Sequence, residues 1–325
     1  MTLFAFSVRR TLAAAPMVVV MIVVNFLLLK AVPGDLVDVM AGESGIATAE
    51  QMADLRARFG LDRSALDQFQ AYLSQLLRFD LGFSFRYNRP IADLVLERLP
   101  ATALLVTVAV LAAVAVGVAA GVLAGRRPGG RFDRAVSVLS SLIFAVPSFW
   151  IGLVGIVLFA VQLRWLPIGG YATVGAPGAG WPHALDVAAH LVLPAATLGL
   201  GYAALYARVT RAAVIETSRL DFVRTARAKG ISETRVTLRH ILRNALLPVV
   251  TLSGLKLGSM LGGAVVVETV FSWPGLGRLA FEAVADRDVN LLLSLFLCNS
   301  LLVIVMGILV DVSYAALDPR IEVAA

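Results

Sequence analysis

The chain has 325 residues, of which 59% are hydrophobic and only 15% charged, and its mean hydropathy is +0.84. Soluble domains do not have this composition, so the chain is a membrane protein with little sequence left for a soluble domain. The net charge of +6 does not indicate nucleic-acid binding, because the basic residues gather on alternate segments between apolar runs.

Six apolar segments are long enough to cross a bilayer, and Lys256 is the only charged residue inside any of them. The first is preceded by Arg9 and Arg10, like a signal peptide, but no clear small-residue cleavage site follows it, so we expect an uncleaved anchor. The sequence therefore predicts an all-α, polytopic membrane protein with six transmembrane helices. The predicted spans cover residues 12–29, 99–125, 135–163, 187–207, 244–267 and 289–310.

A long segment follows the first span and carries two helical patterns. TAEQMADLRARFG begins with Thr48 and Gln51 at the spacing of a helix cap and ends at Gly60. LDQFQAYLSQLLRF repeats apolar residues at helical spacing. We expect two short amphipathic helices here, near the extracytoplasmic surface of the membrane. RWLPIGGYATVGAPGAGWP and FSWPGLGR, further along the chain, are rich in Gly and Pro and predict outer loops.

Basic residues are distributed unequally between the two sides of the predicted membrane. One side carries 16 and the other only three, which are Arg164, Arg278 and Arg287. The positive-inside bias therefore places both termini in the cytoplasm. The predicted organisation is a cytoplasmic N-terminus and first helix at 1–30, an extracytoplasmic loop at 31–98, a five-helix core at 99–315 with a cytoplasmic loop at 208–245, and a cytoplasmic tail at 316–325.

Two predicted spans carry glycines at every fourth position. Residues at this spacing share one helix face, and small residues there let two backbones approach closely, so we predict a role in helix packing. A permeation pathway lined by these faces is the alternative. The residues are Gly117, Gly121 and Gly125 in the second span and Gly254, Gly258 and Gly262 in the fifth.

Ser253 and Lys256 share a face of the fifth predicted span. A serine with a desolvated lysine as its base would form a hydrolase pair, but the two residues lie in mid-span and no oxyanion site is identifiable. A charge within the membrane faces a cavity or a partner, so Lys256 either lines a translocation pathway, with Ser253 and Ser259, or belongs to a structural ion pair.

Other chemistries find little support in the sequence. Each of the three lysines follows Leu or Ala, so the chain has no Walker A sequence and an ATP-driven process would need another polypeptide. No acidic residue lies within a predicted span, which disfavours an ion-driven carrier working alone. The single cysteine, Cys298, excludes an intrachain disulfide, and three scattered histidines show no metal-ligand spacing.

The basic stretch DFVRTARAKGISETRVTLRHILRNALLPVV lies between the fourth and fifth spans. Arg235, Arg239 and Arg243 recur every four residues beside an apolar face, so this half alone could lie at the lipid headgroups and fix topology only. TARAKG predicts a preceding helical segment that ends at Gly230, with Ser232 placed to cap the next helix. Such a bend would project from the membrane and suits docking to a partner.

RTARAKG followed by ALLP resembles the EAA loop of permease subunits of binding-protein-dependent ABC importers, in the form found in dipeptide and oligopeptide permeases. Arg224, Thr225 and Ala226 stand in place of Glu-Ala-Ala, a familiar variant among peptide permeases; Gly230 matches, and Leu247-Pro248 falls five residues late. Further stretches resemble the family, in its order, over nearly the whole chain: RFDLGFSF, RLPAT, VPSFW, LPIGGY, VETVFSWPGLGR and LDPR.

The resemblance implies a type I ABC importer permease in the bacterial cytoplasmic (inner) membrane, forming half of a translocation pathway for dipeptides or oligopeptides. It implies a second homologous permease, two ATP-binding subunits and an extracytoplasmic peptide-binding protein as partners. The chain would be no enzyme and would bind no cofactor, since ATP and Mg belong to the partner subunits. Nickel, glutathione or another small solute stays open as cargo, because relatives with the same motifs carry different solutes.

The resemblance also assigns the coupling loop that would fit a groove on an ATPase subunit. It comprises Arg224, Thr225, Ala226, Arg227, Ala228, Lys229, Gly230, Ile231 and Ser232.

Overall fold

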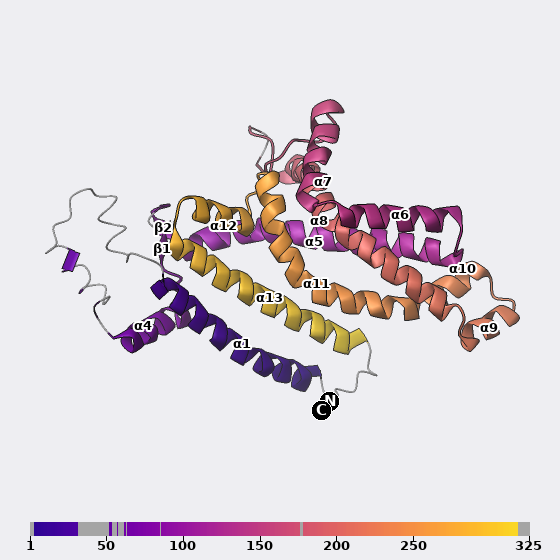
Figure 1. Ribbon diagram of the computed structural model, residues 1–325, viewed down its shortest axis with the longest axis horizontal. Helices are drawn as coiled ribbons and strands as arrows, with labels where there is room; N and C mark the ends of the chain where they lie inside the picture. The colour runs from indigo at the N-terminus through magenta and orange to yellow at the C-terminus, as the bar shows by residue number, and fades with distance from the viewer. Residues whose placement is uncertain are drawn as a thin grey trace.

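The computed structural model describes residues 3–31, 64–84, 86–175 and 178–317, together with 52–53, 57 and 62. Within these residues four helices are long and apolar enough to cross a membrane, and two bent helix pairs bring the number to six if each pair is one span. Helices dominate the molecule, as Figure 1 shows. The predicted all-α, polytopic architecture is confirmed.

The four unbroken helices are α1 (Leu3–Ala31), α5 (Ile91–Arg126), α8 (Gly180–Thr217) and α13 (Val289–Leu317). At a rise of about 1.5 Å per residue, α5 and α8 are roughly 54 and 57 Å long, well beyond a hydrocarbon core of about 30 Å. The second and fourth predicted spans lie within these helices, which extend beyond the apolar run that each prediction covered. A helix continues past that point, since its backbone hydrogen bonds do not depend on apolar side chains.

The third predicted span is a bent pair of helices rather than one straight helix. It consists of α6 (Arg131–Ala145) followed by α7 (Ser148–Gly155) and the π-helix η1 (Ile156–Gln162), with a change of direction of 103°. Proline disfavours the helical conformation of the residue before it, and Val146 has extended dihedrals (φ −107°, ψ 132°) ahead of Pro147. The span predicted over 135–163 is therefore made of two helices that meet at Pro147.

The fifth predicted span is also bent. It lies within α11 (Leu242–Val270), which follows α9 (Asp221–Ala228), α10 (Glu233–Arg235) and the π-helix η2 (Val236–Ile241). The portion that ends at Lys256 and the portion that begins at Gly258 differ in direction by 58°. Because α11 continues to Val270, it includes Glu268, which lies one residue beyond the end of the predicted span.

The remaining elements are short. They are α4 (Ala65–Leu77), the antiparallel pair β1 (Phe83–Ser84) and β2 (Arg89–Pro90), and α12 (Leu276–Ala285), which begins inside the predicted FSWPGLGR loop. The helix α4 is one of the two predicted after the first span, and its N-cap Ser64 accepts a 3.2 Å hydrogen bond from the Asp67 amide. The other predicted helix, with Thr48 and Gln51, lies outside the described residues.

The helices α5 and α8 form the central pair of the fold (Figure 1). They touch backbone to backbone at the glycines of α5: a Cβ added to Gly117 would lie 2.6 Å from the Cβ of Tyr206, and one added to Gly121 would lie 2.5 Å from the Cβ of Thr210. At Gly125 the nearest atom, from Val214, would be 2.8 Å away. Only glycine permits this approach, which is the packing role that small residues have between membrane helices.

The glycines of the fifth predicted span do not act as one face. A Cβ on Gly258 would lie 2.9 Å from a methyl group of Val303 in α13, but one on Gly262 would meet no atom of the described chain within 4 Å. No contact within the described subunit therefore supports the packing role predicted for Gly262. The bend beside Lys256 separates Gly254 from Gly258 and Gly262, so the three glycines do not lie on one straight helix.

The first helix lies beside the last one: α1 and α13 are in contact along the edge of the molecule (Figure 1). Its far end is tied to α4, because Asn25 donates a 2.8 Å hydrogen bond to the Tyr72 hydroxyl and the rings of Phe26 and Phe69 lie 5.2 Å apart. Most of the other described side chains of α1 are exposed, as expected of a helix that meets lipid or another subunit.

Candidate functional site

The bend between α9 and α10 closes the first helix in a Schellman motif. The Gly230 amide donates to the carbonyl of Arg227 (2.9 Å) and the Ile231 amide to that of Ala226 (3.4 Å). Gly230 has a φ of +74°, in the left-handed region, so the predicted helix end at this glycine is confirmed. A Cβ here would meet no described atom within 4 Å, so backbone conformation, and not close packing, requires the glycine.

One side of the bend packs against the end of α8, and the other side is exposed. Val223, Ala226 and Val236 are buried in one apolar cluster with Val214 near the end of α8. Most of the predicted coupling loop is exposed on the opposite side, whereas Ala226 is buried and Ile231 half-buried. The exposed members are Arg224, Thr225, Arg227, Ala228, Lys229, Gly230 and Ser232. The bend is thus a rigid projection with an accessible polar face.

Arg227 holds the two arms of the bend together. Its Nε donates to Glu233 Oε1 at 2.7 Å, and its Nη1 reaches the carbonyl of Ser218 at 3.4 Å. Ser232 occupies the N-cap position of α10 with extended backbone dihedrals, but its side chain forms no cap hydrogen bond, so the predicted side-chain cap is wrong. Instead its carbonyl accepts from the Val236 amide at 2.9 Å.

A buried ion pair fixes the same end of the molecule. Asp133, only 3% exposed, accepts from both Nε and Nη2 of Arg211, so α6 is clamped to α8. The Gly129 amide also donates to the Asp133 carboxylate, at 2.8 Å. Fork-like arginine–carboxylate pairs are strong and directional, and this one holds the α5–α6 turn beside the end of α8.

At the opposite end a completely buried carboxylate joins three helices. Thr102 in α5 donates a 2.6 Å hydrogen bond to Glu268 Oε1, and the amides of Gly277 and Arg278 donate to Oε2 at 2.7 and 3.0 Å. The Thr102 hydroxyl in turn accepts from the Leu276 amide at 2.8 Å. The amides of Leu276, Gly277 and Arg278, at the start of α12, have no acceptor within their own helix. Thr102 and Glu268 accept hydrogen bonds from all three.

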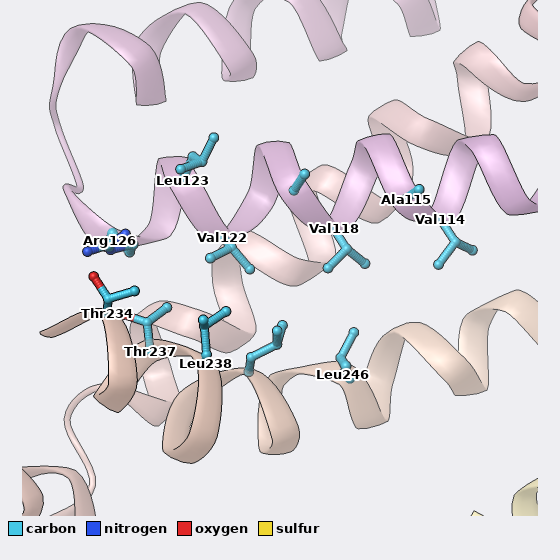
Figure 2. Close-up of a pocket in the computed structure, with 12 residues that line it drawn as sticks. Val114, Ala115, Val118, Val122, Leu123, Arg126, Thr234, Thr237, Leu238 and Leu246 are labelled. Atoms are coloured by element: carbon cyan, nitrogen blue, oxygen red, sulfur yellow. The ribbon is translucent and has the colours of Figure 1, made fainter. Parts of the chain in front are cut away.

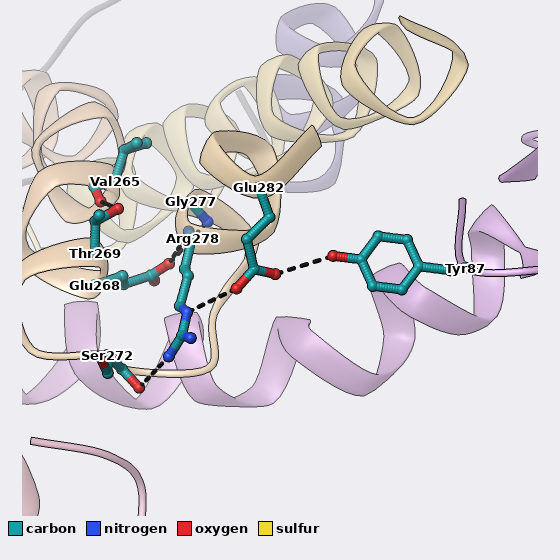
Figure 3. Close-up of polar contacts among 8 residues, drawn as sticks. All are labelled: Tyr87, Val265, Glu268, Thr269, Ser272, Gly277, Arg278 and Glu282. Atoms are coloured by element: carbon teal, nitrogen blue, oxygen red, sulfur yellow. Dashed lines mark hydrogen bonds and ion pairs between the residues drawn. The ribbon is translucent and has the colours of Figure 1, made fainter. Parts of the chain in front are cut away.

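A second set of polar contacts continues from this carboxylate to the β-hairpin (Figure 3). Arg278 Nε donates to Glu282 at 2.8 Å, and the hydroxyl of Tyr87 donates to the other oxygen of Glu282 at 3.1 Å. Burial, and then the charge of Glu282, raise the pKa of Tyr87 to about 12, so the phenol stays a donor at neutral pH. Arg278 also donates to the carbonyl of Ser272 at 2.8 Å, which fixes the loop before α12.

Stretches that are far apart in the sequence meet around this end of α11. Trp273 Nε1 donates to the carbonyl of Ala101 at 2.9 Å, which joins VETVFSWPGLGR to RLPAT. The Gly170 amide donates to the carbonyl of Phe271 at 2.8 Å, which adds LPIGGY. Each of these stretches resembles the same family, but their positions along the sequence did not indicate that they contact one another.

The predicted pathway residues are not brought into one cluster. The Ser253 hydroxyl donates to the carbonyl of Val249 within its own helix, at 2.8 Å, and so does not pair with Lys256 as a hydrolase would require. Lys256 is half-buried at the bend of α11 and forms no ion pair or hydrogen bond with any described residue, and Ser259 is exposed. Glu268, near the end of α11, was not predicted as a functional residue, and its hydrogen bonds are made with residues of α5 and α12. Among the described residues no group of acidic, His or Cys side chains could hold a metal ion.

The family is decided by matches that together extend over almost the whole chain. Residues 117–323 match the family described as "Binding-protein-dependent transport system inner membrane component", and residues 3–106 match the family of its N-terminal region. The chain belongs to this permease family. The resemblance to permease subunits of binding-protein-dependent ABC importers, noted in the sequence, is therefore confirmed.

Relatives of the permease are similar to it from end to end. It is 36% identical to the oligopeptide transport system permease protein AppB of Bacillus subtilis and 38% identical to a putative peptide permease protein of Brucella suis. Each match covers 98% of this chain and 99% of the relative. These relatives carry the names of permeases and not of enzymes, so the permease is a transporter subunit and the Ser253–Lys256 hydrolase is set aside.

The fold is shared with a solved ABC importer. The permease superimposes on a chain of the MetNI methionine ABC transporter in its inward-facing conformation with a TM-score of 0.56 at 18% identity. The match covers 69% of this permease and 96% of that chain. This similarity confirms the predicted ABC importer permease fold.

Proposed function

We propose that this permease takes up dipeptides or oligopeptides and forms half of the translocation pathway of an ATP-driven importer. The observation that carries the proposal is its identity of 36–38%, over nearly its full length, with permeases named for oligopeptide and peptide transport. The partners are a second homologous permease, two ATP-binding subunits that hold ATP and Mg, and an extracytoplasmic peptide-binding protein.

The bend around Gly230 is the coupling element in this proposal. Its exposed face is polar, and its opposite side is buried against the end of α8, which packs closely on α5. A displacement of the bend would therefore move the central α5–α8 pair. ATP binding would close the ATPase subunits, move this bend and switch the cavity between inward and outward access. Arg224 and Lys229, both exposed, would face the ATPase.

The orientation belongs to the same proposal. The side with 16 basic residues faces the cytoplasm of a bacterial cell and carries both termini and the bend. The buried Glu268, α12 and the β-hairpin then lie at the extracytoplasmic end, where the binding protein would deliver peptide.

A pair of variants at one position tests the coupling role. Gly230→Val forces a β-branched residue into the left-handed region, at a cost of about 1–2 kcal/mol, whereas Gly230→Asn tolerates it better and serves as the control. In vesicles that contain the whole transporter, the Val variant should lower both peptide uptake and peptide-stimulated ATP hydrolysis, and the Asn variant should keep most of both. Peptide binding to the external protein should not change.

The same vesicles test the cargo. Uptake of labelled dipeptides and oligopeptides is compared with uptake of nickel and of glutathione. Transport of nickel or glutathione without peptide uptake would replace the proposed cargo and leave the coupling role standing. Wild-type uptake and ATP hydrolysis in Gly230→Val would remove the coupling role and leave the cargo standing.

A further inference from the structure

An apolar groove runs along the surface between α5 and the segment from α10 into α11. It has a volume of about 460 Å³, and Figure 2 shows Val118 and Val122 of α5 facing Leu238 and Leu246 across it. Leu238 is 59% exposed, although its neighbours Val236 and Thr237 are buried. The groove is therefore lined by side chains that the fold of this subunit leaves uncovered.

One end of the groove adjoins a second hollow with a polar lining. Arg126 and Thr234 lie at this end in Figure 2, and the second hollow, of about 540 Å³, shares Thr234 and Leu238 with the first. Ser232, Arg235 and Arg239 complete the lining of the second hollow. The two hollows adjoin at Thr234 and Leu238, with the apolar groove on one side and a basic mouth on the other.

The arginines at the mouth form no ion pair, although Arg126 interacts electrostatically with the Glu233 carboxylate. Arg126, Arg235 and Arg239 are all exposed, and none forms an ion pair with a carboxylate of the described chain. Glu233, which lies in the same segment, is engaged by Arg227 at 2.7 Å. Glu233 offsets part of the charge of Arg126, whereas Arg235 and Arg239 leave the mouth with an excess of positive charge beside hydroxyl groups, which suits a phosphate group.

The length of the groove fits one leaflet of a bilayer. It follows α5 from Val114 to Arg126, which corresponds to about 18 Å at 1.5 Å per residue. Half of a hydrocarbon core is about 15 Å thick. An acyl chain in the groove would thus place its headgroup at the level of the arginines.

We propose that this site binds an anionic phospholipid, with one acyl chain in the α5–α11 groove and the phosphate at Arg126, Arg235 and Arg239. The excess of positive charge favours this occupant over a helix of the second permease, which would cover the apolar walls but leave Arg235 and Arg239 unpaired. The basic stretch of the sequence thus serves two neighbouring purposes: residues before Ser232 form the bend, and those after it hold a lipid. Because the lipid would bridge α5 and α11, its presence would stabilise one spacing of the two helices.

Photochemical cross-linking in the whole transporter tests this proposal. A Leu238→benzoylphenylalanine variant, with its partner subunits, is placed in vesicles of phosphatidylcholine that contain a minority of phosphatidylglycerol, and the adducts are identified by mass spectrometry. We expect phosphatidylglycerol adducts well above the share of this lipid in the vesicle. Leu142→benzoylphenylalanine, at an exposed position of α6, reports the bulk composition.

Charge variants then test the mouth. Each basic residue near a lipid surface raises affinity for anionic lipid about fivefold, so Arg235→Gln with Arg239→Gln should lower the enrichment at Leu238 by fivefold or more. Arg131→Gln with Arg134→Gln removes two exposed charges of α6 outside the groove and should leave the enrichment unchanged. Adducts in proportion to the bulk lipid, adducts with the second permease or an ATPase, or no adducts at Leu238 would each overturn the proposal.

Discussion

Thr102 and Glu268 are 166 residues apart in the chain, yet the threonine hydroxyl donates a 2.6 Å hydrogen bond to the glutamate carboxylate in a completely buried site. The glutamate also accepts from two amides at the start of α12. A single carboxylate thus joins α5, α11 and α12 and replaces the water that those amides would otherwise bind.

Replacement of Glu268 should therefore destabilise the permease strongly. Glu268→Ala leaves the buried amides of Gly277 and Arg278 without acceptors, at about 1–3 kcal/mol for each unsatisfied group. Glu97→Gln is the control, because its ion pair with Arg89 is exposed and such pairs contribute about 0–1 kcal/mol. Thermal unfolding of the purified transporter in detergent measures both. Equal melting temperatures for the two variants would contradict the joining role of Glu268.

Alanine scanning of the glycines should separate two classes that look alike in the sequence. In Gly121→Ala the new methyl group would lie 2.5 Å from the Cβ of Thr210, so α5 and α8 must move apart, at about 1–3 kcal/mol. In Gly262→Ala the methyl group meets open space within this subunit, and the change should be neutral or stabilising by about 0.5–1 kcal/mol. Denaturation of the two variants in parallel checks the order. A Gly262→Ala variant that assembles poorly would show that another subunit packs at this position.

Lys256 should affect transport more than assembly. It forms no ion pair with any described residue, so we propose that it faces the translocation cavity and attracts the carboxylate of a peptide. Lys256→Gln should then lower peptide uptake while the complex still assembles, and Ser141→Ala, at an exposed position of α6 outside the candidate pathway, serves as the control. Uptake by the assembled fraction and its yield after purification are both measured. Loss of assembly with normal uptake per complex would instead assign Lys256 to an ion pair with a partner subunit.

Cysteine labelling should place the two ends of the molecule on opposite sides of the membrane. Arg131 is exposed near the basic end and Val174 is 100% exposed in the loop before α8, so both sites accept cysteine in a Cys298→Ser background. An impermeant maleimide applied to intact cells should label Val174→Cys and not Arg131→Cys, because the basic end is proposed to be cytoplasmic. Inverted membrane vesicles should show the reverse. Labelling of both positions in intact cells would rule out the proposed topology.

The sequence by itself determined the class of the protein and the position of the bend at Gly230. Long apolar runs must be membrane helices because the bilayer offers no partner for an open backbone. Gly230 ended α9 where predicted, because the left-handed conformation of a Schellman motif is a local requirement that one residue type satisfies.

Only the tertiary structure decided which of these residues touch one another. The glycines of α5 and of α11 follow the same spacing, but a Cβ on Gly121 would meet α8, whereas one on Gly262 would meet nothing within the described subunit. Glu268 looked like the end of an apolar span, and its burial became visible only when Thr102 and α12 were placed around it. Long-range pairing of this kind depends on how helices cross, and helix crossing is set by contacts between residues that no local pattern connects.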